Sequence, residues 1–221
     1  MNIPDNLLDE WWYWAAWIVW LPLLVRSIRR APWGRLKDSE QSNVWLGLIV
    51  VLALIWSMKA GVKPGLSLHL LGASVFTLCC GTHLAFIGLS LVLAAVTLNG
   101  ASGWLGFAIN SLLMAGVGVL AAQAFHRLVD RFLPRHFFVY IFVNGFFGSA
   151  LTVICVGLGA CLFLGALGAY SFDYLFAEYL PYYLLLGFSE AWLSGMVMTL
   201  FVVYCPRWVA SFDDTRYLAD K

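Results

Sequence analysis

Charged residues are scarce in this chain. Only 11% of its 221 residues are Asp, Glu, Lys or Arg, whereas 62% are hydrophobic. A soluble domain has roughly 25% charged residues, so the composition excludes an ordinary soluble protein. The formal net charge of +1 gives no basic face of the kind that binds nucleic acid. The composition therefore predicts one membrane-embedded domain over residues 1–221, in contact with lipid and not with nucleic acid.

Two functional features are also missing. The sequence has no phosphate-binding loop of the GxxxxGK[ST] type, so any ATP hydrolysis must belong to another chain. It has no external cysteine pair, and we interpret its five cysteines as packing residues. Cys79, Cys80 and His83 have the chemistry of a soft-metal cluster. However, adjacent cysteines diverge on a helix and no fourth ligand is evident, so buried thiols are the better interpretation.

The positive charges that are present lie mostly in alternate gaps between apolar runs. These gaps hold Arg26, Arg29, Arg30, Arg35 and Lys37, then Arg127, Arg131 and Arg135, and finally Arg207, Arg216 and Lys221. Cation-rich gaps mark the cytoplasmic side of a membrane protein. The pattern predicts an N-terminus outside and a C-terminus inside, with cytoplasmic segments at 26–43, 126–136 and 206–221. Acidic residues precede the first apolar run, which indicates an uncleaved first span behind an external tail, residues 1–10.

The apolar runs predict an all-α, polytopic helical bundle of about seven spans, since a span needs about 20 mostly apolar residues. The spans are expected near 11–25, 44–58, 66–80, 84–98, 104–125, 150–170 and 182–204. The run 137–170 is too long for one untilted helix. It is either one span with a bent or interfacial entry, which we prefer, or two short spans with a turn near 144–148. Residues 171–183 are then an outer loop.

Histidine is the residue type with the most chemical interest. His69 falls near the outer end of the third span, on the side of the N-terminus, whereas His83, His126 and His136 fall on the other side. An imidazole inside a bundle is costly unless it has a partner. A hydrogen bond to a neighbouring helix would suffice, so His69 alone does not establish a functional site.

Four motifs follow one another in an informative order. They are MNIPDNLL at 1–8, LSLHLLGASV at 66–75, FAINSLLMAGVG at 107–118, and LLLGFSEAWLSGMVM at 184–198 followed by CPRW. In order and spacing the chain resembles the CbiM/NikM family, the substrate-binding membrane subunits of cobalt and nickel energy-coupling factor transporters. The resemblance implies capture of a divalent transition metal and its uptake across a bacterial inner membrane. It also implies cytoplasmic ATPase subunits and a transmembrane scaffold subunit as partners.

The same resemblance implies a metal site at the outer face. Its ligands would be the α-amine of Met1, the backbone nitrogen and side chain of Asn2, and the imidazole of His69. Nitrogen ligands suit nickel and cobalt, with copper and zinc as further candidates, and no permanently bound cofactor is expected. The family has histidine where this chain has Asn2, and an amide is a poor ligand for such metals. The site therefore has altered metal binding, an extra ligand such as Asp5, or no transport.

Glu190 is the only acidic residue well inside a predicted span. A carboxylate there faces the bundle interior or water. It would support His69 as a neighbouring carboxylate, act in a relay, or make a helix–helix hydrogen bond with Asn110 or Ser189. Asn110 and Asp5 are further candidates for the surroundings of the metal.

Two alternatives to a transporter subunit remain. A relative that has lost metal binding would serve in assembly or regulation, as Asn2 suggests. An intramembrane enzyme would need paired catalytic groups at one depth, but Ser149 and Glu190 have no evident partners. We therefore expect no catalytic residue in this chain.

Overall fold

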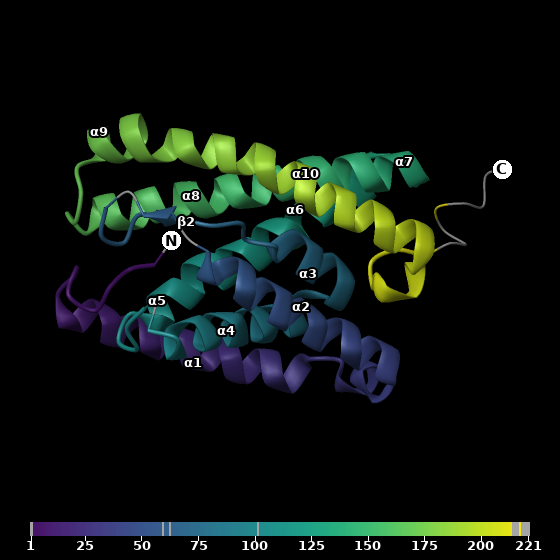
Figure 1. Ribbon diagram of the computed structural model, residues 1–221, viewed down its shortest axis with the longest axis horizontal. Helices are drawn as coiled ribbons and strands as arrows, with labels where there is room; N and C mark the ends of the chain where they lie inside the picture. Colours follow the sequence, from purple (N-terminus) through teal and green to yellow (C-terminus); the bar gives the residue numbers. More distant parts are fainter. Residues whose placement is uncertain (1, 59, 62, 101, 214–216, 218–221) are drawn as a thin grey trace.

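The computed structural model describes residues 2–58, 60–61, 63–100, 102–213 and 217. Its architecture is a bundle of helices with one two-stranded sheet in the described part (Figure 1). The first half of the chain gives α1 (Glu10–Arg30), α2 (Ser39–Ser57), β1 (Ala60–Gly61), β2 (Ser67–Leu68), α3 (Ala73–Cys80) and α4 (Thr82–Leu98). The antiparallel strands pair Ala60 with Leu68 and Gly61 with Ser67.

The second half of the chain forms three long rods, each with a π-helical stretch inside it. The first joins α5 (Phe107–Ser111) to α6 (Gly118–Phe132), and the second joins α7 (Phe137–Val139) to α8 (Gly148–Ala166). The third joins α9 (Phe172–Tyr174) to α10 (Leu180–Tyr204). Short 3-10 turns lie at Trp33–Lys37 and Pro206–Trp208.

Four helices of the described part are long and apolar enough to cross a membrane. They are Ser39–Ser57, Phe107–Phe132, Phe137–Ala166 and Phe172–Tyr204, and the shorter apolar helix Thr82–Leu98 lies beside them. The predicted all-α, polytopic class is thus confirmed. The number of crossings and the orientation of the chain stay predictions.

The region 137–170 resolves into one continuous helix from Phe137 to Ala166 rather than two short spans. Its π-helical stretch, Tyr140–Phe147, occupies the place where a turn was the alternative. Helices also extend further than predicted at two expected loops. α6 continues to Phe132 inside 126–136, and the rod that starts at Phe172 takes up most of 171–183. The amphipathic sequence of α6 and the capping hydroxyl of Ser171 favour helix at these places.

The third predicted span, 66–80, was wrong in its first half. Residues 66–72 are extended or irregular, and the helix α3 has only eight residues, all of them buried. Gly72 ends the extended part with φ +67°, a left-handed conformation that favours glycine. A Cβ atom at Gly72 would also collide with Leu52 of α2. The backbone N–H groups before α3 bond to a side chain instead of to a preceding helical turn, as described below.

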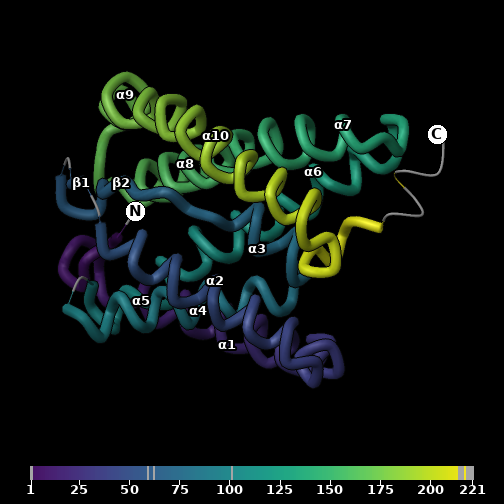
Figure 2. The backbone as a smooth tube through the Cα atoms, turned by 45° about the vertical axis from the view of Figure 1, so that its right-hand side comes forward, coloured from purple at the N-terminus to yellow at the C-terminus, as the bar shows by residue number. Residues whose placement is uncertain are grey.

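α3 lies at the centre of the bundle, between α4, α6, α8 and α10 (Figure 2). Close approach of the outer helices depends on glycines that face aromatic rings. Gly157 of α8 faces the ring of Tyr183, and Gly195 of α10 faces Phe146. In lipid, helices associate through such van der Waals contact. Leu71 and Gly72, the last residues of the extended segment before α3, are buried.

Candidate functional site

The N-terminal tail docks against the start of α5 through Asn110. This amide is fully buried, accepts the Ile3 N–H at 2.8 Å and donates to the Ile3 carbonyl at 3.0 Å. It pairs with the tail as a neighbouring strand would. The same Nδ2 lies 3.5 Å from the side-chain oxygen of Asn2. Asn110, which the sequence suggested as part of the metal's surroundings, therefore contacts the tail directly.

Asp5 fixes the tail to the turn before α5. Its Oδ1 accepts the N–H of Gly106 at 2.7 Å, and its carboxylate fills the space where a Cβ of Gly103 would stand. Pro4 is held too, because its carbonyl accepts the hydroxyl of Tyr13. The contacts of Asp5 are those of an anchor for the tail, which explains two glycines in the turn.

His69 belongs to the segment that runs beside this tail. Asn2 forms an isolated antiparallel bridge with Gly65, in which the Asn2 N–H lies 3.4 Å from the Gly65 carbonyl. His69 follows four residues later, half-buried, and its ring lies 4.8 Å from the ring of Trp56 on α2. Its Nδ1 lies 3.1 Å from the carbonyl of Leu70. The segment that carries His69 is thus bound to the tail that carries Asn2.

His69 lines part of a small cavity. The cavity has a volume of about 10 Å³, and its lining includes Met114 and Tyr183. That volume is close to the minimum that one water molecule requires. The lining therefore includes a thioether and an imidazole, a soft and a borderline donor, which suit transition metals better than calcium or magnesium.

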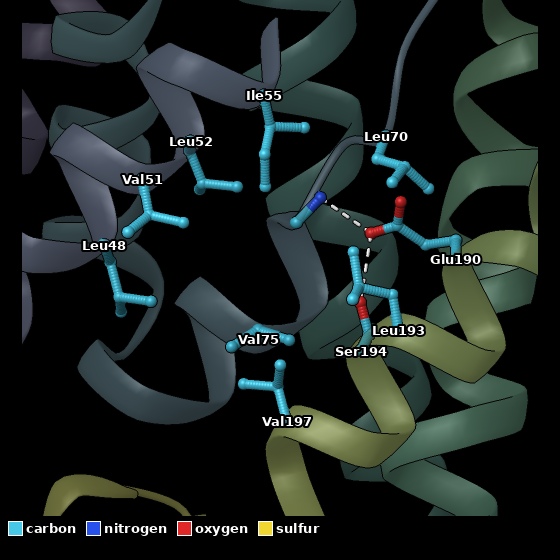
Figure 3. Close-up of a pocket in the computed structure, with 11 residues that line it drawn as sticks. Leu48, Val51, Leu52, Ile55, Leu70, Val75, Glu190, Leu193, Ser194 and Val197 are labelled. Atoms are coloured by element: carbon cyan, nitrogen blue, oxygen red, sulfur yellow. Dashed lines mark hydrogen bonds between the residues drawn. The ribbon is translucent and has the colours of Figure 1, made fainter.

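Glu190 of α10 holds the segment that follows His69. Its Oε2 accepts the Leu71 N–H at 2.8 Å, and its Oε1 accepts the Gly72 N–H at 2.6 Å and the Ser194 hydroxyl at 3.2 Å. The last two bonds converge on one oxygen in Figure 3. The carboxylate is 2% exposed and borders a mainly apolar cavity of about 80 Å³. The expected partners Asn110 and Ser189 are wrong, since they bond to Ile3 and to Leu185 instead.

The structure thus collects most of the predicted residues around one docked tail. Asn2, Asp5 and Asn110 meet at the tail, and His69 lies in the segment bridged to it. Glu190 reaches that segment from the other side. Met1 lies outside the described residues.

Sequence reasoning missed two residues of the site. Trp56 packs on the His69 ring and donates from Nε1 to the Leu71 carbonyl at 3.2 Å. Its place in an apolar run gave no signal. Ser67 of β2 has a buried hydroxyl with no hydrogen-bond partner, two residues before His69, which follows the strand in the same extended segment. Side chains two apart in a strand point to the same face, which was not foreseeable while 66–80 was expected to be helical.

The other candidate residues show structural roles. In the described part of the chain, no group of three or more His, Cys, Asp or Glu side chains has the arrangement of a metal site. Cys79 and Cys80 are buried at the end of α3, as the packing interpretation predicts. Nδ1 of His126 lies 3.3 Å from the side-chain oxygen of Asn144, and His136 caps α7.

A membrane-embedded helical bundle with a docked N-terminal tail defines the general class of this protein. The family model described as "CbiM: Cobalt uptake substrate-specific transmembrane region" matches residues 2–208. The chain belongs to this family, as its motifs predict, and is a membrane transport component.

Solved structures share the fold. One is described as a transition metal transporter and another as a truncated transition metal transporter, and each has a TM-score of 0.75 and 18% identity. Both alignments cover 92% of this chain, together with 93% of the first and 99% of the second. At this identity the likeness shows the fold alone. No curated protein sequence matches the chain.

Proposed function

We propose that this chain is the substrate-capture subunit of an energy-coupling factor transporter. It binds a divalent transition metal of the cobalt or nickel class at the outer face of a bacterial inner membrane. Family membership and the fold shared with transition metal transporters support the substrate class. The observation that carries the proposal is the paired bonding of Asn110 to Ile3, which keeps the tail beside the segment of His69.

The proposed ligands are the α-amine of Met1, a backbone nitrogen or the amide oxygen of Asn2, and an imidazole nitrogen of His69. A free α-amine has a pKa near 8, so a metal can displace its proton close to neutral pH. Asn110 and Asp5 keep the tail in place for this binding, and Glu190 supports the segment that carries His69. Asn2 contributes less than a histidine would, so we expect weaker binding than an imidazole at this position would give.

The energy for uptake comes from other chains in this proposal. The sequence has no phosphate-binding loop, so a pair of cytoplasmic ATPase subunits and a transmembrane scaffold subunit are the proposed partners. The basic segments 26–43 and 126–136 would face these partners or anionic lipid on the cytoplasmic side. Copper and zinc are further candidate substrates.

The test is metal binding by the purified full-length protein, measured by calorimetry with nickel, cobalt, copper and zinc. The native N-terminus is compared with a form that carries one additional residue before Met1. We expect the extension to abolish binding, since it moves the amine out of the site. Equal affinity in both forms would remove the amine from the proposal.

Two variants complete this test. His69→Gln should lose binding, whereas Asn2→His should increase affinity by supplying the missing imidazole. His126→Gln is the matched control, because His126 bonds to Asn144 and is remote in sequence from the tail segment.

A second candidate function is favoured by one observation. The side-chain oxygen of Asn2 lies 3.5 Å from Nδ2 of Asn110, so this amide has a bonding role in the docked tail without any metal. In that case the chain is a relative that no longer transports metal and acts in assembly or regulation. Failure of the native form to bind any of the four metals, together with gain of binding in Asn2→His, would support this candidate.

A further inference from the structure

Glu190 and His69 are connected through a single peptide group. The Leu70 carbonyl lies 3.1 Å from Nδ1 of His69, and the Leu71 N–H, at the other end of the same peptide group, donates to Glu190 Oε2 at 2.8 Å. A carbonyl oxygen can only accept a hydrogen bond, so Nδ1 carries the proton in this contact. The lone pair of the neutral imidazole is then on Nε2. Carboxylate, peptide and imidazole form one hydrogen-bonded line.

We propose that Glu190 is a positioning residue for His69 that acts through the Leu70–Leu71 peptide group. The carboxylate sets the orientation of this peptide, whose carbonyl selects the Nδ1–H tautomer. Nε2 is thereby presented as the metal-binding atom. Metal-binding histidines almost always donate their other N–H to a carboxylate, a backbone carbonyl or water, and here the first two act in series. This inference rests on the proposed role of His69 as a metal ligand.

The next peptide group is also held at both ends. Its N–H, from Gly72, donates to Glu190 Oε1 at 2.6 Å, and its carbonyl, from Leu71, accepts from Trp56 Nε1 at 3.2 Å. Trp56 belongs to α2 and Glu190 to α10, so the segment is fixed between two long helices. Rotation of the Leu70–Leu71 peptide group would break the hydrogen bond of its carbonyl with His69 and that of its N–H with Glu190. This arrangement gives His69 a defined direction before any metal binds.

The environment of Glu190 fits a charged carboxylate rather than an amide. Its three partners, Leu71, Gly72 and Ser194, are all donors, and it lies at the N-terminus of α3, where a negative charge is favoured. A glutamine has one acceptor oxygen and one NH₂ group. It would satisfy one peptide N–H and place its own donors against the other. Glu190→Gln is therefore a nearly isosteric change that breaks the arrangement.

The experiment compares full-length wild-type and Glu190→Gln protein in detergent, labelled with ¹⁵N-histidine and free of metal. The imidazole nitrogen shifts report the tautomer, and His69→Gln identifies the His69 signals among the four histidines. We expect a single Nδ1–H tautomer in the wild type and a mixture of tautomers in Glu190→Gln. Metal affinity should fall about ten- to a hundredfold, as for other residues that orient a metal ligand.

Two controls separate the relay from a general loss of structure. Ser194→Ala removes one hydrogen bond to Glu190 but leaves the two hydrogen bonds from the backbone N–H groups of Leu71 and Gly72. The His69 tautomer and the metal affinity should therefore stay as in the wild type. Trp56→Phe keeps an aromatic ring near His69 but removes the donor to Leu71, so it should reduce affinity by less than Glu190→Gln does. If Glu190→Gln does not fold, unchanged tautomer and affinity in Trp56→Phe would overturn the proposal.

The outcomes also distinguish this inference from the proposed function. A wild-type protein that binds none of the four metals refutes metal capture, yet the tautomer comparison in metal-free protein still decides the relay. The role of Glu190 is overturned if the Glu190→Gln protein keeps a single Nδ1–H tautomer of His69. Where the wild type binds metal, the Glu190→Gln protein would then also bind it within twofold of the wild-type affinity.

Discussion

Asn110→Ala should release the N-terminal tail while leaving the helical bundle folded. The substitution deletes the partner of both Ile3 backbone groups, whose bonds measure 2.8 and 3.0 Å. Leaving one buried polar group unpaired costs about 1–3 kcal/mol, so the docked tail loses about 2–6 kcal/mol. Even the lower limit of about 2 kcal/mol lowers the equilibrium constant for tail docking roughly thirtyfold, since about 1.4 kcal/mol corresponds to a factor of ten. The tail avoids this cost by leaving its site, where water can solvate Ile3.

Hydrogen exchange of residues 2–8 in metal-free protein measures this release directly. Faster exchange confined to the tail is expected, with a metal affinity reduced by a similar factor, because binding would first require redocking. Ser102→Ala is the matched control, since the Ser102 hydroxyl accepts from Nδ2 of Asn110 at 3.4 Å and donates to the Gly103 carbonyl, but bonds to no described residue of the tail. Wild-type exchange rates and affinity in Asn110→Ala would refute the idea that this amide holds the tail.

Two further substitutions test the segment that carries His69. Ser67→Ala removes a buried hydroxyl that has no hydrogen-bond partner, so the free energy of unfolding in detergent should rise by about 1 kcal/mol or less. Metal affinity should stay unchanged. A loss of affinity would instead show that this hydroxyl contacts the metal or its bound water. Gly72→Ala should destabilise the protein by more than the about 1–2 kcal/mol of a left-handed residue, because its Cβ also meets Leu52. Gly168→Ala is its control, with φ +70° and open space around the Cβ; equal melting temperatures of the two variants would contradict the role of Leu52.

The sequence was sufficient for the class of fold because hydropathy reports directly on lipid exposure. Every membrane span meets the same apolar environment, so each one requires a long apolar run, and cations cluster in the segments between spans. It was insufficient at 66–72, because apolar residues there suit a buried extended strand as well as a helix. In the structure, Glu190 of α10 accepts the Gly72 N–H and Leu52 of α2 packs against Gly72, and these contacts come from helices distant in sequence.

The motifs predicted several residues that the structure brings close to the docked tail, but they did not predict the bonds between them. The motifs at 1–8, 66–75 and 184–198 indicated Asn2, His69 and Glu190 as a group. Pairing depends on backbone atoms, which carry no sequence signal. Asn110 bonds to the main chain of Ile3, and Glu190 bonds to main-chain N–H groups. Helix–helix pairing with the side chain of Asn110 or Ser189, one of the three alternatives for Glu190, was wrong for that reason.

This preference for backbone contacts bears on the missing histidine. Asn110 reaches the main chain of Ile3, and Asp5 reaches the main chain of Gly106, so neither anchor of the tail depends on the side chain at position 2. A tail with histidine at position 2 would keep the same two anchors. Under the proposed function, a change at position 2 would therefore alter the ligand set, and with it the choice of metal, while the contacts that hold the tail stay the same.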